Sequence, residues 1–495
     1  MPKNKLFYGD NLDILRRKIK DGTVDLCYID PPFNSKRNYN QIYNNVGGED
    51  RAQAQAFIDT WIWDDLAASG YDEIISNAAG RFQPQLVQLV KGLRSVLREG
   101  SLLAYIVSMS LRLTEIHRTL TPTGSFYLHC DPTASHYLKL VLDSIFCSQG
   151  GDFKNEIVWH YRRWTGLAKK FQELHDTIFF YTKSADYTFN PLYTPYTEGS
   201  KARKEQGVLH RFKEGEAPHL VSERSIDPKG VRENDVWQIP FVAPSAKERL
   251  GYPTQKPEAL LDRIIRASSN KNDVVLDAYC GCGTTVAVAE QLGRRWIGMD
   301  ITYQSISLIL RRLEHSYGKD VLLDIKTDGI PRDMESAEAL AHKQDDRLRK
   351  EFEKWAVLTY TNNRAVINEK KGADAGIDAR AYFKVGKHDN ASIIFQVKSG
   401  GVKRGDIATL RGDMEREEAA LAVLITLEEP TKPMNSEAKA AGQYRYEDMG
   451  HSYDRISIVT VREIVEADRR LEIPMSLEVL KAAQKATDSE QIDLL

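Results

Sequence analysis

The chain has 495 residues, of which 42% are hydrophobic and 28% charged, and its formal net charge is −2. This length predicts two or three domains, since a single hydrophobic core rarely grows so large. No apolar run approaches the roughly 18 residues of a membrane helix, so no membrane partner is expected. Five scattered cysteines and the lack of a signal-peptide core favour reduced thiols and a cytoplasmic location over a disulfide framework.

Strand and helix patterns alternate through most of the first 325 residues. The chain begins with a strand-like segment, and a second strand over 24–29 ends at Asp30-Pro31-Pro32-Phe33, because two prolines cannot continue a strand. The alternation predicts a mostly parallel, doubly wound α/β sheet. Its other expected elements are helices over 86–98, 109–119, 135–146, 257–268 and up to about 292, and strands over 125–129, 176–181, 274–276 and 295–299.

Residues 155–250 interrupt this alternation. The segment is polar, rich in Lys, Arg, Gly and Pro, and only weakly periodic outside 176–181. Its basic residues suit either contacts with DNA phosphates or a plain solvated surface. The basic residues singled out as candidate DNA contacts are Arg162, Arg163, Lys169, Lys170, Arg203, Lys204 and Arg211.

A smaller αβ unit is expected at the C-terminal end. Residues 326–349 are charged and predict a helical linker, the unit itself covers 350–470, and residues 471–495 form a polar tail. The expected elements are helices over 350–359 and 404–418, and strands near 377–384, 391–398, 420–426 and 456–461.

The run from Leu276 to Thr285 predicts a ligand site at the carboxyl edge of the larger sheet. It reads as a strand, a glycine turn and the start of a helix, and an acidic residue, Asp300, ends the next strand 23 positions after Asp277. A carboxylate such as Asp300 suits the hydroxyls of a ribose, and Asp277 suits the ammonium of a methionine moiety. The candidate cofactor residues of this region are Asp277, Tyr279, Gly281, Gly283, Thr284 and Asp300.

Two alternatives apply to this run. A nicotinamide-dependent oxidoreductase would use a similar turn, but Val286 stands where the third glycine of the dinucleotide fingerprint belongs. An ordinary strand-to-helix turn without a ligand is the other alternative.

Asp30-Pro31-Pro32-Phe33 predicts the chemistry. An exocyclic base amine is a poor nucleophile because its lone pair is delocalised into the ring. Acceptors on both N–H groups would localise that pair, and Asp30 and the Pro31 carbonyl supply them, while Pro32 offers no N–H and Phe33 offers a stacking face. The base must leave the duplex to reach such a pocket. The lone pair would then attack an electrophilic methyl carbon directly. This methyl transfer needs positioning and electrostatics, with no covalent intermediate and no metal.

Over residues 5–310 the chain resembles the β-class amino-methyltransferases of bacterial restriction–modification systems, in which the catalytic motif precedes the cofactor motif. The similar segments, besides the two already described, are 7–11, 127–136, 155–159, 175–181 and 252–257. The resemblance implies a Rossmann-like domain over 1–325 that uses S-adenosylmethionine. It places Thr254 and Lys256 at the methionine end of that cofactor and Asp10 at its adenine. Tyr279 stands where the family more often has Phe, which keeps an aromatic ring.

The resemblance also implies the substrate. In this family Asp-Pro-Pro followed by an aromatic residue tends to accompany N6-adenine enzymes, so we expect site-specific methylation of N6 of adenine in double-stranded DNA. N4 of cytosine is the alternative. Residues 155–250 become the target-recognition segment, with phosphate and base-edge contacts. The subunit count is open, with a homodimer among the candidates.

The C-terminal unit predicts a nuclease site. Gln396 and Lys398 share one strand face next to Asp378, an arrangement that suits an oxygen-bound divalent cation, such as Mg²⁺, and a lysine that steadies the attacking water. The unit looks like restriction-endonuclease-like domains with an Asp…Gln-x-Lys site, in some of which a glutamate on the preceding helix adds a ligand, here Glu351 or Glu353. Gln in place of Glu removes one ligand charge. A solitary methyltransferase with a non-cutting, DNA-binding C-terminal domain is therefore the alternative.

Overall fold

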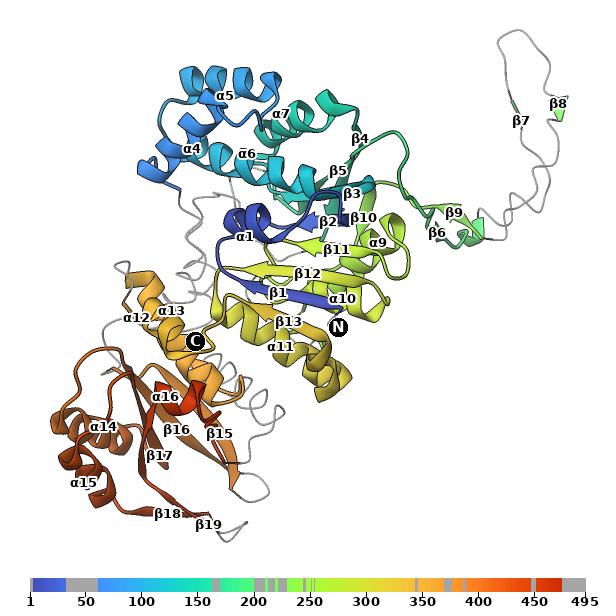
Figure 1. The fold of residues 1–495 in the computed structure, drawn as a ribbon. Coiled ribbons are helices and arrows are strands. Elements are labelled where there is room, and N and C mark those ends of the chain that lie inside the picture. The colour runs from blue at the N-terminus through green and yellow to red at the C-terminus, as the bar shows by residue number, and fades with distance from the viewer. Residues whose placement is uncertain are drawn as a thin grey trace.

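A computed structural model shows two αβ units joined by a short helical connection (Figure 1). The larger unit contains the N-terminus, and the smaller one begins after about residue 330. The structure describes residues 3–32, 61–162, 169, 171–199, 210–211, 219–220, 229–243, 246–250, 252, 254–342, 346–368, 376–385, 389–446 and 451–473.

The larger unit is built on a nine-stranded sheet, as far as the described residues show, in the order β10-β4-β5-β3-β2-β11-β12-β1-β13. β5 runs antiparallel to both of its neighbours, whereas the other neighbouring pairs are parallel. This mixed α/β sheet agrees with the doubly wound fold that the sequence predicts. The strands are β1 (Asn4–Tyr8), β2 (Val24–Ile29), β3 (Leu120–Cys130), β4 (Asp152–His160), β5 (His175–Thr182), β10 (Val236–Gln238), β11 (Val274–Asp277), β12 (Arg295–Asp300) and β13 (Ile325–Asp328).

Helices cover both faces of this sheet (Figure 1). Two separate clusters of buried apolar side chains fill the space between the sheet and each helix layer, because the central parallel strands are hydrophobic on both faces. One layer contains α1 (Asn11–Lys18), α4 (Asp65–Ser76), α5 (Pro84–Leu97), α6 (Ser101–Thr119) and α7 (Ser135–Ile145), followed by the short 3-10 helix η1 (Cys147–Gln149). The other contains α9 (Glu258–Ser268), α10 (Thr284–Gln291) and α11 (Tyr303–Tyr317), followed by η2 (Lys319–Asp324).

Two strands lie where the sequence favoured irregular or helical structure. β4 opens the segment expected to be irregular, and β13 lies in the expected helical connector. Both strands contain few buried residues. In β4 these are Ile157 and Trp159, near its end, and in β13 it is Ile325. The apolar alternation that marks a half-buried strand is therefore too short to recognise in either.

Short strand pairs occur within the segment interpreted as the target-recognition insertion. β6 (Tyr193–Thr194) pairs with β9 (Val231–Arg232), and β7 (His210–Arg211) pairs with β8 (His219–Leu220). Figure 1 shows both pairs beyond the edge of the large sheet, with β7 and β8 farthest from it.

The smaller unit has a five-stranded sheet in the order β14-β15-β16-β17-β20, within the described residues. β16, β17 and β20 are parallel, whereas β15 is antiparallel to its neighbours β14 and β16. The strands are β14 (Val366–Ile367), β15 (Ala379–Val385), β16 (Asp389–Lys398), β17 (Leu421–Thr426) and β20 (Ile456–Thr460), with a separate pair β18 (Gln443–Tyr446) and β19 (His451–Asp454). The helices are α12 (Met334–Ala341), α13 (Asp346–Tyr360), α14 (Arg404–Arg416), α15 (Lys432–Ala440) and α16 (Val461–Val465).

The two faces of the smaller sheet pack against different helices. Apolar residues of α13 and α16 pack on one face, and those of α14 and α15 on the other. The buried cluster on the α13 side continues into the larger unit, so the two units are packed together through α11 and α13.

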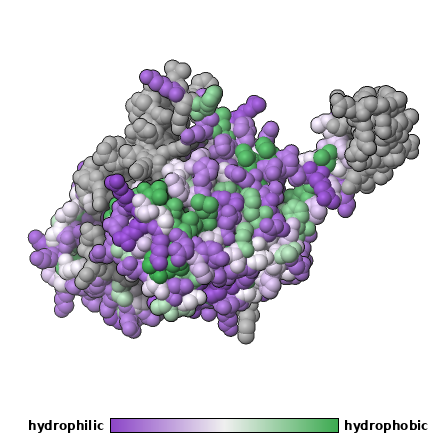
Figure 2. Space-filling view, turned by 90° about the horizontal axis from the view of Figure 1, so that it is seen from above, coloured by the Kyte–Doolittle hydropathy of each residue, from purple (hydrophilic) through white to green (hydrophobic). Residues whose placement is uncertain are grey.

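The face of the molecule seen from above is mixed in polarity. Hydrophilic residues surround smaller apolar patches on the face shown in Figure 2. No helix in the described part of the chain combines the length and the apolar character that a membrane span requires.

Candidate functional site

The carboxyl ends of parallel strands bring the predicted acidic residues to one edge of the larger sheet. β2, β11 and β12 are consecutive and parallel in the sheet, and they lead into Asp30, Asp277 and Asp300 respectively. Neighbouring parallel strands are about 5 Å apart, so side chains at their ends converge. The chain order separates these residues by up to 270 positions, and the topology brings them together.

The glycine turn after β11 is held close to the next strand. Cys280 N donates to the Met299 carbonyl at 3.0 Å, and Gly281 N donates to an Asp300 carboxylate oxygen at 2.8 Å. Gly281 and Gly283 have φ of +49° and +74°, which glycine adopts without strain. A Cβ on Gly283 would stand 2.6 Å from the Ile309 side chain, so this position has no room for a larger residue.

Asp300 and Asp277 are both buried and lie close to protein donors. Thr302 donates to Asp300 through its backbone N and its hydroxyl, at 2.9 and 3.0 Å. Tyr279 N donates to Asp277 at 2.9 Å. Burial raises the pKa of Asp277 to about 7 and that of Asp300 to about 6, against the opposing effect of these hydrogen bonds. Two buried carboxylates of this kind favour a ligand with an ammonium group and hydroxyl donors.

Lys256 joins the glycine turn to the Asp30-Pro31-Pro32 motif. Its ammonium lies 2.5 Å from an Asp30 carboxylate oxygen, and its backbone carbonyl accepts from the Thr284 hydroxyl at 3.2 Å, at the start of α10. The family resemblance places Lys256 at the methionine end of the cofactor, whereas in the structure its ammonium contacts Asp30. Pro31 and Pro32 follow Asp30 directly and are described, while Phe33 lies outside the described residues.

The other predicted cofactor residues are near the same edge. Asp10 caps α1 by accepting from Leu12 N at 2.8 Å, and its second oxygen pairs with Arg112 at 2.9 Å. Tyr279 is half-buried, and its hydroxyl lies 3.5 Å from the Met109 sulfur. Thr254 is half-buried two residues before Lys256.

Arg312 is a supporting residue that sequence reasoning missed. It is buried on α11, donates to the Cys282 carbonyl at 3.3 Å and to the Thr284 hydroxyl at 3.2 Å, and pairs with Glu258 at 2.7 Å. It thereby ties the glycine turn to α9 and α11. A lone arginine in a helical pattern gives no sign of this role.

A buried polar chain behind Asp30 was also missed. The Tyr28 hydroxyl lies 2.9 Å from His129 Nδ1, and His129 Nε2 lies 3.1 Å from an Asp176 carboxylate oxygen. The Tyr161 hydroxyl donates to the other Asp176 oxygen at 3.3 Å. These residues come from four strand ends or their continuations, so the chain fixes β2, β3, β4 and β5 against one another next to the catalytic motif. His129 and Asp176 lie in two of the segments that resemble the family, 127–136 and 175–181, which was the available signal.

The predicted nuclease residues gather at one edge of the smaller sheet. Asp378 accepts from Val397 N at 2.7 Å, and burial raises its pKa to about 6, although the positive charges of Lys398 and Lys350 oppose that rise. The Gln396 amide donates to the Gly376 carbonyl at 2.9 Å. Its carbonyl oxygen is buried and has no hydrogen-bond partner among the described residues, which leaves an acceptor for a cation.

The metal-ligand set of this edge is small. No group of three or more His, Cys, Asp or Glu side chains suited to a metal occurs in the described part of the chain. Glu351 is buried with both carboxylate oxygens engaged by other residues, and Glu353 is half-buried. Among the described residues this edge offers the Asp378 carboxylate and the free Gln396 oxygen, with the positive charges of Lys398 and Lys350 acting on Asp378.

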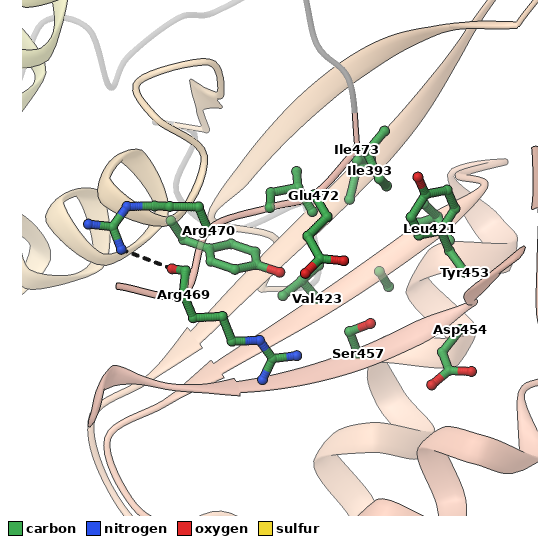
Figure 3. Close-up of a pocket in the computed structure, with 13 residues that line it drawn as sticks. Ile393, Leu421, Val423, Tyr453, Asp454, Ser457, Arg469, Arg470, Glu472 and Ile473 are labelled. Atoms are coloured by element: carbon green, nitrogen blue, oxygen red, sulfur yellow. Dashed lines mark hydrogen bonds between the residues drawn. The ribbon is translucent and has the colours of Figure 1, made fainter. Parts of the chain in front are cut away.

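A cavity of about 130 Å³ lies elsewhere in the smaller unit (Figure 3). Ile393 and Val423 form part of its wall, and Arg469 and Glu472 come from the segment after α16. Residues 393 and 396 of β16 point to opposite faces of the sheet. The cavity is therefore separate from Gln396 and the nuclease edge.

Of the basic residues proposed to contact DNA, few are described. Arg162 and Lys169 are exposed, as phosphate contacts require. Arg211 is in β7, where the backbone alone is described. Arg163, Lys170, Arg203 and Lys204 lie outside the described residues.

The fold and this edge together define the class of the protein. The sheet is mixed and doubly wound, with a glycine turn after β11, an acidic end to β12 and an Asp-Pro-Pro motif after β2, as the resemblance to the amino-methyltransferases leads one to expect. The DNA methylase family of N6/N4 type matches residues 24–311, more than half of the chain, and the chain belongs to this family. A restriction endonuclease family matches residues 348–458. The protein is thus a DNA methyltransferase with a restriction-endonuclease-like domain.

Curated relatives agree with this membership. The DNA adenine methyltransferase YhdJ of Escherichia coli (strain K12) is 29% identical over 329 residues, which are 65% of this chain and 87% of the relative. The Type II methyltransferase M1.MboII of Moraxella bovis is 35% identical over 210 residues, 39% of this chain and 75% of the relative. The Type II methyltransferase M.HpaI of Haemophilus parainfluenzae is 28% identical over 52% of this chain and 74% of its own length.

Solved structures include similar chains at low identity. The chain M1.HpyAVI, solved as a complex with SAM, is 16% identical with a TM-score of 0.33 and covers 62% of this chain and 99% of its own. The cytosine-N4-specific PvuII DNA methyltransferase is 14% identical with a TM-score of 0.37, over 65% of this chain and 93% of its own.

Proposed function

We propose that the protein transfers a methyl group from S-adenosylmethionine to N6 of an adenine flipped out of double-stranded DNA, at a specific site. The observation that carries this proposal is the bridge made by Lys256, whose ammonium contacts Asp30 and whose backbone contacts the helix start of the glycine turn. The catalytic motif and the ligand turn are therefore parts of one site. When bound, S-adenosylmethionine supplies the electrophilic methyl group.

The residues of the glycine turn fit this cofactor. The Asp277 carboxylate suits the ammonium of the methionine moiety, and Asp300 suits ribose hydroxyls. Both carboxylates are buried with raised pKa values, so a ligand that brings donors to them relieves the cost of their burial. Gly281 and Gly283 let the backbone come close to the ligand.

Asp30 and Pro31 would act on the base. One carboxylate oxygen of Asp30 is held by Lys256, and within the described residues the other has no partner, so it is available to an amino hydrogen of the base. The Pro31 carbonyl would accept the second amino hydrogen. Together they localise the nitrogen lone pair and aim it at the methyl group. Lys256 orients the carboxylate and offsets part of its charge.

Adenine is favoured over cytosine by the residue at the first position of the motif. A carboxylate stands at position 30, the pattern that tends to accompany N6-adenine enzymes, and the E. coli relative is named as an adenine methyltransferase. N4-cytosine methylation is the alternative. Exposed Arg162 and Lys169 would contribute phosphate contacts to the duplex.

Incubation with labelled S-adenosylmethionine and plasmid DNA, followed by single-molecule mapping of modified bases, tests this function. We expect label on adenine N6 within one sequence context. Label on cytosine N4 would select the alternative, and the absence of transfer from a protein that binds the cofactor would refute the proposal.

A second activity is supported by the buried, unpartnered oxygen of Gln396 beside Asp378. We propose a Mg²⁺-dependent nuclease site in which Asp378 and Gln396 hold the cation and Lys398 steadies the attacking water. Glu353 is the further candidate ligand on α13. A domain that grips DNA without cutting it is the alternative, and it predicts no nicking of any DNA with Mg²⁺ present.

A further inference from the structure

Glu351 is a residue of the smaller unit that reaches the cofactor edge of the larger one. It lies on α13, inside the stretch that the restriction endonuclease family matches, and only 7% of its surface is exposed. A carboxylate is rarely buried unless it is paired or hydrogen-bonded. Its partners therefore indicate what it is for.

Those partners come from both units. Tyr303 N, at the first residue of α11, donates to one carboxylate oxygen at 2.7 Å, and Lys354 from the next turn of α13 donates to the other at 2.8 Å. The Tyr8 hydroxyl lies near Glu351. Burial and, after it, the charge of Glu351 raise the pKa of that phenol well above its usual range. The ring of Tyr8 meets that of Tyr303 edge-on, with centroids 5.8 Å apart.

Both contacts in the larger unit lead directly to Asp300. Thr302, one residue before Tyr303, donates to the Asp300 carboxylate through its backbone and hydroxyl. Gly9, one residue after Tyr8, donates its N–H to the Asp300 carbonyl at 2.9 Å. Glu351 thus holds the α11 end of the loop that joins β12 to α11, while the glycine turn contacts the Asp300 carboxylate in the same loop.

We infer that Glu351 is a positioning residue for the S-adenosylmethionine site, contributed by the endonuclease-like domain, so that cofactor affinity depends on the docking of α13. This inference rests on the proposed use of Asp300 by the cofactor. The N-terminus of α11 carries partial positive charge, which a carboxylate at Tyr303 N complements. With Glu351 in place, the Asp300 loop is held in one arrangement before the ligand arrives.

The neighbouring residue extends the connection to the other site. Lys350 precedes Glu351 on the same turn of α13, and its charge acts on Asp378 at the nuclease edge. The first half of α13 therefore lies near both sites of the molecule. Coupling between sites is reciprocal, so cofactor binding stabilises the docked position of α13 to the degree that docking favours the cofactor.

Calorimetric binding of S-adenosylmethionine to full-length Glu351→Gln tests the inference. The substitution keeps the shape and removes the charge. We expect the Kd to rise about 5- to 20-fold, in the range usual for coupled sites. The KM for the cofactor should rise by a similar factor, with kcat within about twofold, because the base pocket is unchanged. Glu335→Gln on neighbouring α12, an exposed glutamate, is the matched control and should bind as the wild type does.

A purely structural role predicts something different. In that case Glu351→Gln would have a lower thermal stability but a Kd for S-adenosylmethionine within twofold of the wild type. That result would overturn the inference. If Glu351→Gln does not fold, Tyr8→Phe serves in its place, because it removes the hydroxyl near Glu351. This variant must raise the Kd for S-adenosylmethionine at least twofold. Hydrogen exchange gives an independent readout, in which cofactor slows exchange over residues 346–360 in the wild type and not in the variant.

These outcomes are separable from the proposed function itself. A wild-type protein that does not bind S-adenosylmethionine refutes the proposed function. A wild-type protein that binds it, together with a Glu351→Gln variant that binds equally well, refutes the role of Glu351 alone.

Discussion

The two sheets of the molecule present carboxylates at their edges in different surroundings. At the edge of the larger sheet, Asp277 and Asp300 lie among backbone amides and hydroxyls, and Lys256 contacts Asp30. At the edge of the five-stranded sheet, Asp378 is accompanied by an amide, Gln396, and an ammonium, Lys398. The first edge offers several directed hydrogen bonds to an organic ligand, whereas the second offers a carboxylate, an amide oxygen and an ammonium group.

This difference separates the two proposed chemistries. In the proposed methyl transfer at the first edge, some groups act on the base and others hold the cofactor, so single substitutions should divide into those that affect the base and those that affect the cofactor. The cutting proposed for the second edge would use a bound cation, so removal of the cation should abolish it.

Asp30→Ala should have the largest effect. We expect the single-turnover rate of methyl transfer to DNA to fall about 1000-fold, as when a group acting on the developing charge is lost, while the Kd for S-adenosylmethionine stays within about twofold. Tritium transfer to duplex DNA and calorimetry measure the two quantities. Asp72→Ala, at an exposed position of α4, is the control. An unchanged transfer rate would remove Asp30 from the mechanism.

Lys398→Ala should separate the second edge from the first. We expect DNA cutting with Mg²⁺ to fall about 100-fold or more, because the attacking water loses the ammonium group that orients it. The methyl-transfer rate should stay unchanged. Gel assays of plasmid nicking measure the cutting, and addition of a chelator should stop it in the wild type. Cutting that persists in the variant, or in the wild type without metal, would show that the edge of the smaller sheet is not the nuclease site.

The pH dependence of cofactor binding should give an intermediate effect. Burial raises the pKa of Asp277 from 3.8 to about 7, so this carboxyl is mostly protonated at pH 6 and mostly ionised at pH 8. An ammonium group binds the ionised form, and affinity should therefore weaken about tenfold from pH 8 to pH 6, with release of a proton on binding near pH 7. Calorimetry in buffers of different ionisation enthalpy measures both. Asp277→Asn should bind weakly with little pH dependence, and the same slope in that variant would assign the titration to another group.

Tyr28→Phe should have the smallest effect. It removes the hydroxyl that lies 2.9 Å from His129 Nδ1, and a neutral buried hydrogen bond contributes about 1 kcal/mol to the free energy of unfolding. Denaturant unfolding measures this quantity, and cofactor affinity should stay unchanged. A loss of several kcal/mol would show that the buried chain through Asp176 acts cooperatively.

Sequence patterns identified the parts of the site that are local in the chain. Asp30, Asp277 and Asp300 each follow a short apolar strand and open a turn, and such a boundary is visible from prolines, glycines and hydrophobic runs. Their convergence follows from the parallel order of the strands, which the alternation of elements predicts. The class of the fold was therefore predictable and is confirmed.

The contacts that cross the chain were not predictable. Lys256 meets Asp30 across 226 positions, and Glu351 meets Tyr303 between two units. Neither contact can be recognised from sequence periodicity, because the pattern around a single charged residue does not indicate which distant residue it contacts. β4 and β13 escaped recognition for a related reason, since strands at or near the sheet edge bury too few residues to show alternation.

The most direct test of the central claim is a crystal structure with S-adenosylhomocysteine and a duplex containing the recognition sequence. Our account predicts an adenine outside the helix, with its N6 within about 3 Å of both an Asp30 carboxylate oxygen and the Pro31 carbonyl. An adenine that stays stacked in the duplex, or an extruded base whose amine contacts neither group, would contradict it.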